Sequence, residues 1–382
     1  MAIQTECANL RSGGVKLNGF RSSDTQMREI LDPVELEPLH QAFADVFAEV
    51  QRGGLLKDFV WDDGRYLVAL DGTGYFCSSQ ICCPSCLERK TSSGEVQYSH
   101  QAVVAVLVHP QRREVIPLGI EPIVKQDGES KNDCERNASR RLLERIRRQH
   151  PRLKMVITED GLSSNGPHIK DLERLGFSYI LGAKPGDHQH LFDAIIKAGD
   201  EGKFSTCHTP SPKKKGNSRA TSWVKQLPLN ASHPDLSVNV VLQTEYTAEE
   251  KEVAKFSWVT NLPVSEERAV RIAEAGRSRW RIENETFNTL KNQGYHFEHN
   301  YGHGKQNLSS VLAILMLLAF LVDQIQQACC PLFQDLESKY KTRRQLWQRL
   351  RSSVECFVFG SFDQLYRAML KDQTLNQLAP YS

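Results

Sequence analysis

Short apolar runs separated by turn-forming residues define the middle of the chain. Runs at residues 66–70, 101–108 and 114–122 are rich in strand-forming side chains, and His109-Pro110-Gln111 separates the last two. This pattern predicts three strands in an antiparallel meander. The pattern then predicts a helix at 132–149, a strand at 154–158, a helix at 167–175 and a strand at 179–182.

Helical patterns flank this segment on both sides. Apolar residues recur at helical spacing after Asp32-Pro33, from Leu36 to Phe47. Near the other end, Ser265-Glu266-Glu267 is a helix start signal, and the helical pattern continues to Lys291 with a break expected at Gly276. Residues 308–329 predict a further, buried helix.

These elements divide the chain into five expected parts. Thr209 to Ser218 has the composition of a flexible basic linker, and strands are expected after it at 238–246 and 254–261. We therefore expect a helical N-terminal region at 1–63, an RNase H-like core at 64–200, a β-rich insertion with a return strand at 201–262, helices that complete the core at 263–330 and a basic C-terminal region at 331–382. The predicted fold class is α/β, an RNase H-like mixed sheet flanked by helices and interrupted by a β-rich insertion, with helical N-terminal and C-terminal regions.

Composition is that of a globular protein without a membrane span. The chain has 382 residues, of which 25% are charged and 40% hydrophobic. The longest apolar run, 311–322, is too short to cross a bilayer, and the N-terminus does not have the pattern of a secretory leader. We expect a cytoplasmic protein with no membrane partner, whose ten cysteines are mostly reduced thiols.

Charge is uneven along the chain although the net charge is only +2. One basic cluster comprises Arg136, Arg140, Arg141, Arg145, Arg147, Arg148, Arg152 and Lys154. A second comprises Lys339, Lys341, Arg343, Arg344, Arg349 and Arg351. Such clusters attract nucleic acid through counterion release, and the alternative for each is a solvated helix face.

Three acidic residues stand where metal-dependent phosphate chemistry would need them. Asp71 ends the apolar run 66–70, and Asp160 ends the run 155–159, so both are expected at the ends of buried strands. Glu283 lies in Arg279-Trp280-Arg281-Ile282-Glu283 on a predicted helix. A carboxylate framed by arginines can bind a cation while the guanidinium groups hold a phosphodiester.

The order of these motifs resembles that of the DDE transposases of bacterial insertion sequences, and most closely the insertion-sequence-four type. Leu70-Asp71-Gly72-Thr73, Thr158-Glu159-Asp160-Gly161-Leu162, Trp258-Val259-Thr260-Asn261-Leu262 and the Arg279 to Glu283 motif follow one another as in that group. The resemblance covers about Tyr66 to Val322. Its last motif has tyrosine, two residues, arginine, three residues, glutamate, six residues and lysine.

The resemblance implies a DNA-cutting enzyme. Asp71, Asp160 and Glu283 would hold two Mg²⁺ (or Mn²⁺) ions, and the site would cleave transposon ends and transfer the freed strand to target DNA. Arg279 would clamp a phosphate, with Lys291 as its helper. DNA is the implied partner, and a homodimer is expected in the DNA complex, because two DNA ends must be brought together.

Two departures from the motif leave alternatives open. Gly276 stands where the group has tyrosine, and the lysine falls one place late, at Lys291, since Leu290 occupies the expected position. The extra residue allows Glu285 as the third acid, although the intact motif around Glu283 favours Glu283. An inactive, transposase-derived DNA-binding protein and a metal-dependent nuclease without strand transfer remain alternative functions.

Cysteine and histidine form two further groups. Cys82-Cys83-Pro84-Ser85-Cys86 could hold zinc at Cys83 and Cys86, with Cys77, His100 and Cys134 as partners, or could be reduced thiols in a hairpin. His296, His299 and His303 follow the Glu283 helix. We expect this segment to be a DNA-facing loop, with His299 as a DNA-binding residue, rather than a metal site.

Overall fold

The computed structural model describes residues 24–128, 131–211 and 216–371. Of the N-terminal region, residues 1–23 lie outside the described part. The rest of it is helical as expected, with α2 (Asp24–Leu31) and α3 (Leu36–Arg52) followed by the short turn η1 (Leu55–Phe59) and strand β1 (Val60–Asp62). Phe43 and Phe47 of α3 are buried because their spacing places both on one helix face.

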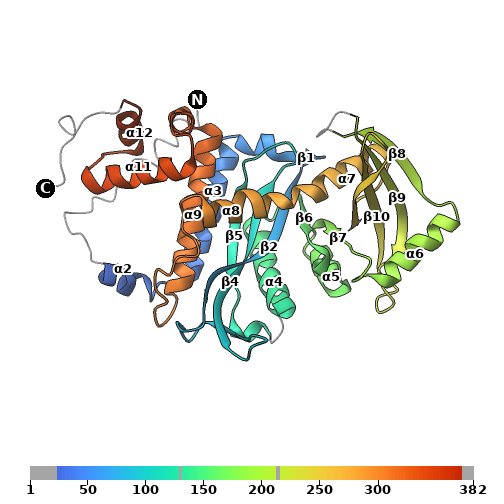
Figure 1. Cartoon of the computed structure of the whole chain (residues 1–382), viewed down its shortest axis with the longest axis horizontal. Coiled ribbons are helices and arrows are strands. Elements are labelled where there is room, and N and C mark those ends of the chain that lie inside the picture. Colours follow the sequence, from blue (N-terminus) through green and yellow to red (C-terminus); the bar gives the residue numbers. More distant parts are fainter. Residues whose placement is uncertain (1–23, 129–130, 212–215, 372–382) are drawn as a thin grey trace.

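A mixed sheet forms the centre of the molecule (Figure 1). Its central strands lie in the order β5-β4-β2-β6-β7. The pairs β4–β5 and β2–β4 are antiparallel, whereas β2–β6 and β6–β7 are parallel. The strands are β2 (Arg65–Ser78), β4 (Val96–Val108), β5 (Ile116–Pro122), β6 (Met155–Glu159) and β7 (Ser178–Gly182). This order confirms the predicted RNase H-like α/β fold.

The β-rich segment continues the same sheet. Strand β11 pairs antiparallel with β7, and β10, β9 and β8 follow outward from it. In the described part of the chain, eleven strands therefore form one sheet, and β3 (Leu87–Lys90) extends the β4 edge. The added strands are β8 (Ser205–Pro210), β9 (Ser218–Pro228), β10 (Ser237–Tyr246) and β11 (Glu252–Thr260).

The predicted linker at Thr209–Ser218 is wrong in part. Its two ends belong to the paired strands β8 and β9, and residues 212–215 lie outside the described part. Polar residues such as Thr206 and Ser222 face each other across this pair, with hydroxyl oxygens 2.8 Å apart. The apolar alternation that marks a strand is therefore weak there.

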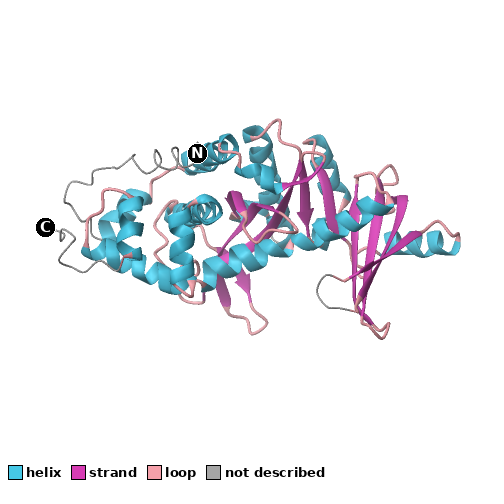
Figure 2. Cartoon of the chain, turned by 90° about the horizontal axis from the view of Figure 1, so that it is seen from above, coloured by secondary structure: helices cyan, strands magenta, loops and turns pink. Residues whose placement is uncertain are grey.

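Helices cover the sheet on its flanks (Figure 2). Helix α4 packs on β4 and β5, α5 on β7, and α6 on β9. Asn165 caps α5 because its side chain accepts a hydrogen bond from the His168 amide. The ranges are α4 (Lys131–Gln149), α5 (Gly166–Arg174) and α6 (Gln189–Asp200), with short turns η2 (Lys125–Asp127) and η3 (Gly161–Ser163). Helix α6 was not expected from the sequence.

A long helical run then crosses the sheet. It consists of α7 (Glu266–Ser278), the π-helical turn η4 (Ile282–Phe287) and α8 (Asn288–Asn292), and it leads to α9. Ser265 caps α7 as predicted, since its hydroxyl accepts from the Arg268 amide at 3.3 Å. The predicted break at Gly276 is wrong, because Gly276 lies inside α7.

Gly276 is required by packing rather than by a bend. A methyl group at this position would lie 2.2 Å from Nε1 of Trp258, a buried residue of β11. The Trp258 ring thus fills the space beside the helix backbone, so a side chain as large as tyrosine does not fit there.

Helix α9 (Leu308–Cys329) is a core helix, as predicted. It is the one described helix that is long and apolar enough to span a membrane. It packs on α3 and β5, and its buried Gln324 accepts a hydrogen bond from the Val115 amide of the region before β5. After it, α10 (Pro331–Lys339), α11 (Arg343–Cys356) and α12 (Phe362–Leu370) form a small second core.

At least half of the first basic cluster is paired with acidic residues of the fold. Arg141 pairs with Glu121 and Asp127, both buried, and Arg145 pairs with Glu121 at 2.6 Å. Other pairs are Arg140 with Asp171 and Arg148 with Glu37. The structure therefore favours a stabilising role for these arginines on α4 over the expected attraction of nucleic acid.

Candidate active site

The register of two parallel strands brings Asp71 and Asp160 together. Ala69 of β2 lies opposite Thr158 of β6. Two residues further along are Asp71, within β2, and Asp160, directly after β6. Strand alternation places both acids on the same side of the sheet, and neighbouring strands lie about 5 Å apart. Asp160 follows β6 directly, as predicted.

Asp71 lies within its strand and not at the end of it. Strand β2 continues to Ser78 because it keeps pairing with the first half of β4, for example Gly72 with Val103. The sequence prediction that Asp71 ends a strand is therefore wrong. The apolar run stops at Leu70 because the side chains beyond it are less deeply buried, while backbone pairing goes on.

Arg279 joins Asp71 to Glu283. One terminal nitrogen of its guanidinium donates to Asp71 Oδ2 at 2.9 Å, and the other donates to Glu283 Oε1 at 2.8 Å. Arg279 and Glu283 are four residues apart, which places them on one face of the helical run. The structure thus connects the sheet acid Asp71 to the helix acid Glu283, two residues 212 positions apart in the sequence.

The electrostatics of Asp71 reflect this crowding. Burial raises its pKa to about 6, and repulsion from Glu283 and Asp160 adds to the rise. The Arg279 guanidinium and the Gly72 amide act in the opposite direction. The cost of burying the ionised carboxylate therefore outweighs the favourable effects of Arg279 and Gly72.

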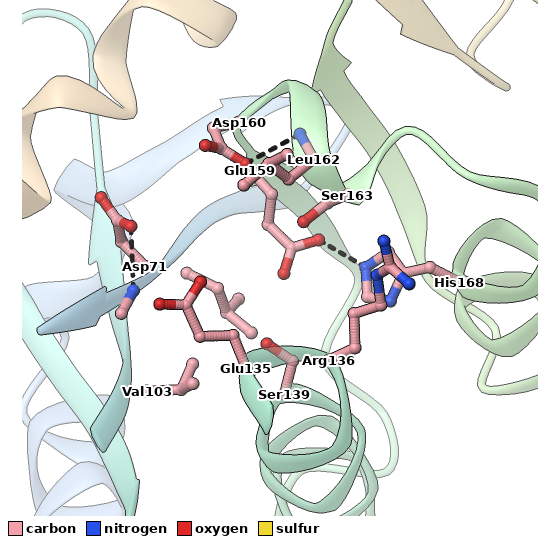
Figure 3. Close-up of a pocket in the computed structure, with 12 residues that line it drawn as sticks. Asp71, Val103, Glu135, Arg136, Ser139, Glu159, Asp160, Leu162, Ser163 and His168 are labelled. Carbon is pink, nitrogen blue, oxygen red and sulfur yellow. Dashed lines mark hydrogen bonds and ion pairs between the residues drawn. The ribbon is translucent and has the colours of Figure 1, made fainter. Parts of the chain in front are cut away.

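A pocket opens beside Asp71 and Asp160 (Figure 3). It contains carboxylates that sequence reasoning missed. The side chain of Glu135, on α4, points toward Asp71. It lies close to the Gly72 backbone, since a methyl group added to Gly72 would be 2.8 Å from Glu135 Oε1. Deeper in the pocket, Glu159 and His168 form a buried pair at 2.5 Å.

Glu159 changes the pKa of its buried partner His168. Burial lowers the pKa of His168, but the Glu159 carboxylate outweighs burial, so the pKa is raised. The signal in the sequence was the position of Glu159 on a buried strand, where an acid needs a partner. Its partner could not be identified without the fold, since His168 lies on α5.

The other predicted site residues lie elsewhere. Glu285 pairs with Arg113 at 3.6 Å, while Lys291 pairs with Glu298 at 2.9 Å. His299 is exposed and packs edge-on against the Tyr301 ring, with 4.7 Å between ring centroids. None of these three lines the pocket beside Asp71 and Asp160.

The π-turn accounts for the late lysine. A π-turn holds roughly one residue more than an α-turn. The eight positions from Glu283 to Lys291 therefore span about the two turns that seven positions span in an α-helix. The extra residue is absorbed within η4, and Glu283 keeps its place relative to Arg279.

Four cysteine and histidine side chains converge at a second place. Cys83, Cys86, His100 and His303 have ligand atoms that all lie within 4.8 Å of one another. The expectation that all three loop histidines face DNA is wrong for His303, because His303 belongs to this cluster. The proposed partners Cys77 and Cys134 are wrong, because Cys77 is exposed outside this cluster and Cys134 donates to the Gly128 carbonyl.

The acids of the first site form a donor set suited to Mg²⁺. Asp71, Asp160 and Glu283 offer only carboxylate oxygens, the hard ligands that Mg²⁺ and Mn²⁺ prefer. Burial raises the pKa of Asp71, and the negative charges of Glu283 and Asp160 add to the rise against the effect of Arg279. A divalent cation would offset these charges further.

Comparison with known protein families identifies one that matches this chain. A sequence profile of the family described as "Transposase DDE domain" matches residues 85–321, a stretch that contains Asp160 and Glu283 and begins after Asp71. No individual curated protein matches the chain. This family generally uses divalent metals and acts on DNA. Because the match covers more than half of the sequence, the chain belongs to the DDE transposases.

Proposed function

We propose that this protein is an active transposase that cleaves DNA at transposon ends and transfers the freed strand to target DNA. Asp71, Asp160 and Glu283 would hold two Mg²⁺ (or Mn²⁺) ions. The observation that carries this proposal is the pair of hydrogen bonds from Arg279 to Asp71 and Glu283, with Asp160 directly after the strand that pairs with the Asp71 strand. The Arg279 to Glu283 spacing also supports the insertion-sequence-four type.

The roles of the acids follow from their positions. When bound, the cations would activate a water or a 3′-hydroxyl and stabilise the leaving oxygen. Asp71 and Asp160 stand on a rigid sheet, which fixes the distance between them. Glu283 is half-exposed on the helical run, so it can approach from the side open to a DNA strand.

Three basic residues would bind the DNA backbone. Arg279 pairs with Asp71 and Glu283. Once cations neutralise those acids, its guanidinium would be available to a phosphate. Lys291 and His299, on and after α8, would contact phosphates further along the strand. We also propose that two copies pair in the DNA complex and that the protein works in the cytoplasm.

The test is a cleavage and strand-transfer assay with Mg²⁺ on a DNA that carries the transposon ends. Asp71→Asn, Asp160→Asn and Glu283→Gln should each reduce cleavage by more than about 100-fold, the upper range for losing a residue that only supports a metal ligand. DNA binding should persist in all three. Glu285→Gln is the matched control and should retain cleavage, because Glu285 pairs with Arg113 instead.

The products distinguish the alternative functions. Cleaved ends joined to target DNA would support a transposase, and cleavage without joining would identify a nuclease. Binding without cleavage by the unaltered protein would identify an inactive DNA-binding descendant. Full activity in Asp71→Asn or Asp160→Asn would refute the assignment of the acids.

A further inference from the structure

We propose that Cys83, Cys86, His100 and His303 bind one structural Zn²⁺ ion. The ion would clip the loop that follows α8 to the hairpin that begins with β2. The ligands come from three segments, namely the turn between β2 and β3, strand β4, and the loop between α8 and α9. This site is separate from the three acids, and it does not depend on the protein's being an active transposase.

The distances between ligand atoms match a tetrahedral zinc site. With Zn–S bonds of about 2.3 Å and Zn–N bonds of about 2.0–2.1 Å, tetrahedral ligand atoms lie about 3.3–3.8 Å apart. The two sulfur atoms are 3.6 Å apart, and His100 Nε2 is 3.3 Å and 3.4 Å from them. His303 Nδ1 is 3.6 Å from Cys86 Sγ and 3.3 Å from His100 Nε2.

Local backbone geometry positions the ligands on both sides. Cys83 to Cys86 form a turn in which the Cys86 amide donates to the Cys83 carbonyl at 3.1 Å, and the Cys83 amide donates to Cys86 Sγ at 3.3 Å. His303 lies between Gly302 (φ 109°) and Gly304 (φ 67°). These left-handed conformations favour glycine and let the chain turn sharply around the histidine.

The site is closed, as structural zinc sites are. Cys86 is fully buried and His100 is 4% exposed. The Phe76 ring lies edge-on to His303, with 4.1 Å between centroids, and Tyr75 stacks against His100 at 5.8 Å. Four protein ligands complete a tetrahedral set, so no coordination position is left for a reacting water.

A disulfide does not explain the cluster. The Cys83 and Cys86 sulfur atoms are 3.6 Å apart and both residues are free cysteines, whereas a disulfide bond is about 2.05 Å long. Two imidazole nitrogens against the same two thiols make up a mixed sulfur and nitrogen donor set. In tetrahedral geometry such a set is typical of zinc.

The clip would anchor one side of the loop between α8 and α9. The other side is already held by Asp32, whose carboxylate accepts from the amides of Lys305, Gln306 and Leu308. Because β2 carries Asp71 and the loop follows the run that carries Glu283, zinc would tie the two segments that supply these acids to each other. Without it, the segment around His303 would lose the covalent link to the Cys83–Cys86 turn.

Metal analysis of the purified full-length protein tests the proposal. After dialysis into metal-free buffer, elemental mass spectrometry should find about one zinc per chain. Cys83→Ser and His303→Ala should each lose at least about 90% of the bound zinc, since loss of one ligand opens a closed four-ligand site. Cys82→Ser is the matched control, because Cys82 is exposed in the same turn but outside the cluster, and it should keep the zinc.

A second measurement covers variants that fail to fold. Zinc is removed from the unaltered protein by a chelator under reducing conditions, and Co²⁺ is added in its place. The absorption bands of tetrahedral Co²⁺ bound to thiolates should appear, and hydrogen exchange at residues 294–304 should slow when the metal is restored. Iron in place of zinc, no bound metal together with no Co²⁺ bands, or equal metal loss in Cys82→Ser would overturn the proposal.

Discussion

The ionised form of Asp71 is disfavoured by its surroundings in the fold. Its ordinary pKa is 3.8, and burial with two neighbouring acids raises the pKa to about 6 in the fold. Between these two pH values the folded protein binds more protons than the unfolded chain, so stability falls as pH rises through this window. Above pH 6 the full cost of the ionised carboxylate is present.

The first prediction concerns the loss of stability caused by the ionised Asp71 carboxylate. Asp71→Asn should raise the free energy of unfolding of the metal-free protein at pH 7 by about 1–3 kcal/mol, because it removes the ionised group. The gain should shrink as pH falls through 6 and nearly vanish near pH 4. Urea denaturation of both proteins across this pH range measures it. A variant that is less stable at pH 7, or a gain independent of pH, would contradict this account of Asp71.

At the scale of single elements, the π-turn η4 absorbs the extra residue between Glu283 and Lys291. It lies between α7, which packs on the sheet, and α8, whose Leu290 is buried. Asn284 is exposed within it. One residue can leave a π-turn and restore an α-turn, and the helices on either side then keep their faces.

Deletion of Asn284 should therefore be tolerated. We expect the free energy of unfolding to change by no more than about 1 kcal/mol, because the lost residue is exposed. Deletion of Glu274, inside the regular helix α7, is the control. It rotates everything after it by about 100° and should move Arg279 away from Asp71. Chemical denaturation and cleavage assays compare the two, and equal damage from both deletions would show that the π-turn does not absorb the extra residue.

At the scale of the whole molecule, the placement of charge matters more than its sum. The chain carries a net charge of only +2, and its two basic clusters differ in their surroundings. On α4, Arg141 pairs with the buried Glu121 and Asp127, whereas Arg344 and Arg349 on α11 are exposed. The α11 cluster is therefore better placed to meet DNA.

The two clusters should respond differently to loss of an arginine. Arg141→Gln should lower the free energy of unfolding by about 2–4 kcal/mol, because it leaves the buried Asp127 without its arginine and Glu121 with Arg145 alone. The affinity of the folded protein for DNA should not change. Arg344→Gln should leave the free energy of unfolding unchanged. It should reduce the slope of log K for DNA binding against log salt concentration by about 1, the value for one lost phosphate contact. Denaturation and binding titrations at several salt concentrations measure both effects. If Arg141→Gln weakened DNA binding and Arg344→Gln did not, the DNA-binding surface would lie on α4 instead.

The order of strands and helices could be predicted from the sequence because it rests on local patterns. Alternating and clustered apolar residues marked β4, β5, β6 and β7, and the Ser265 cap marked the start of α7. Strands β8 and β9 could not be predicted, since their polar cross-strand pairs do not alternate with apolar residues. The π-turn was equally hidden, because an extra residue in a helical pattern does not reveal where the helix absorbs it.

The sequence by itself determined the fold class and the family resemblance, and it singled out the three acids as candidates, because each depends on residue type and order along the chain. The tertiary structure alone decided which partners those residues have. It linked Arg279 to both Asp71 and Glu283, directed the α4 arginines to buried carboxylates, and brought His303 to Cys86 across 217 residues. The physical reason is that charge compensation and metal coordination act over a few ångströms in space, whereas sequence patterns report only on neighbours along the chain.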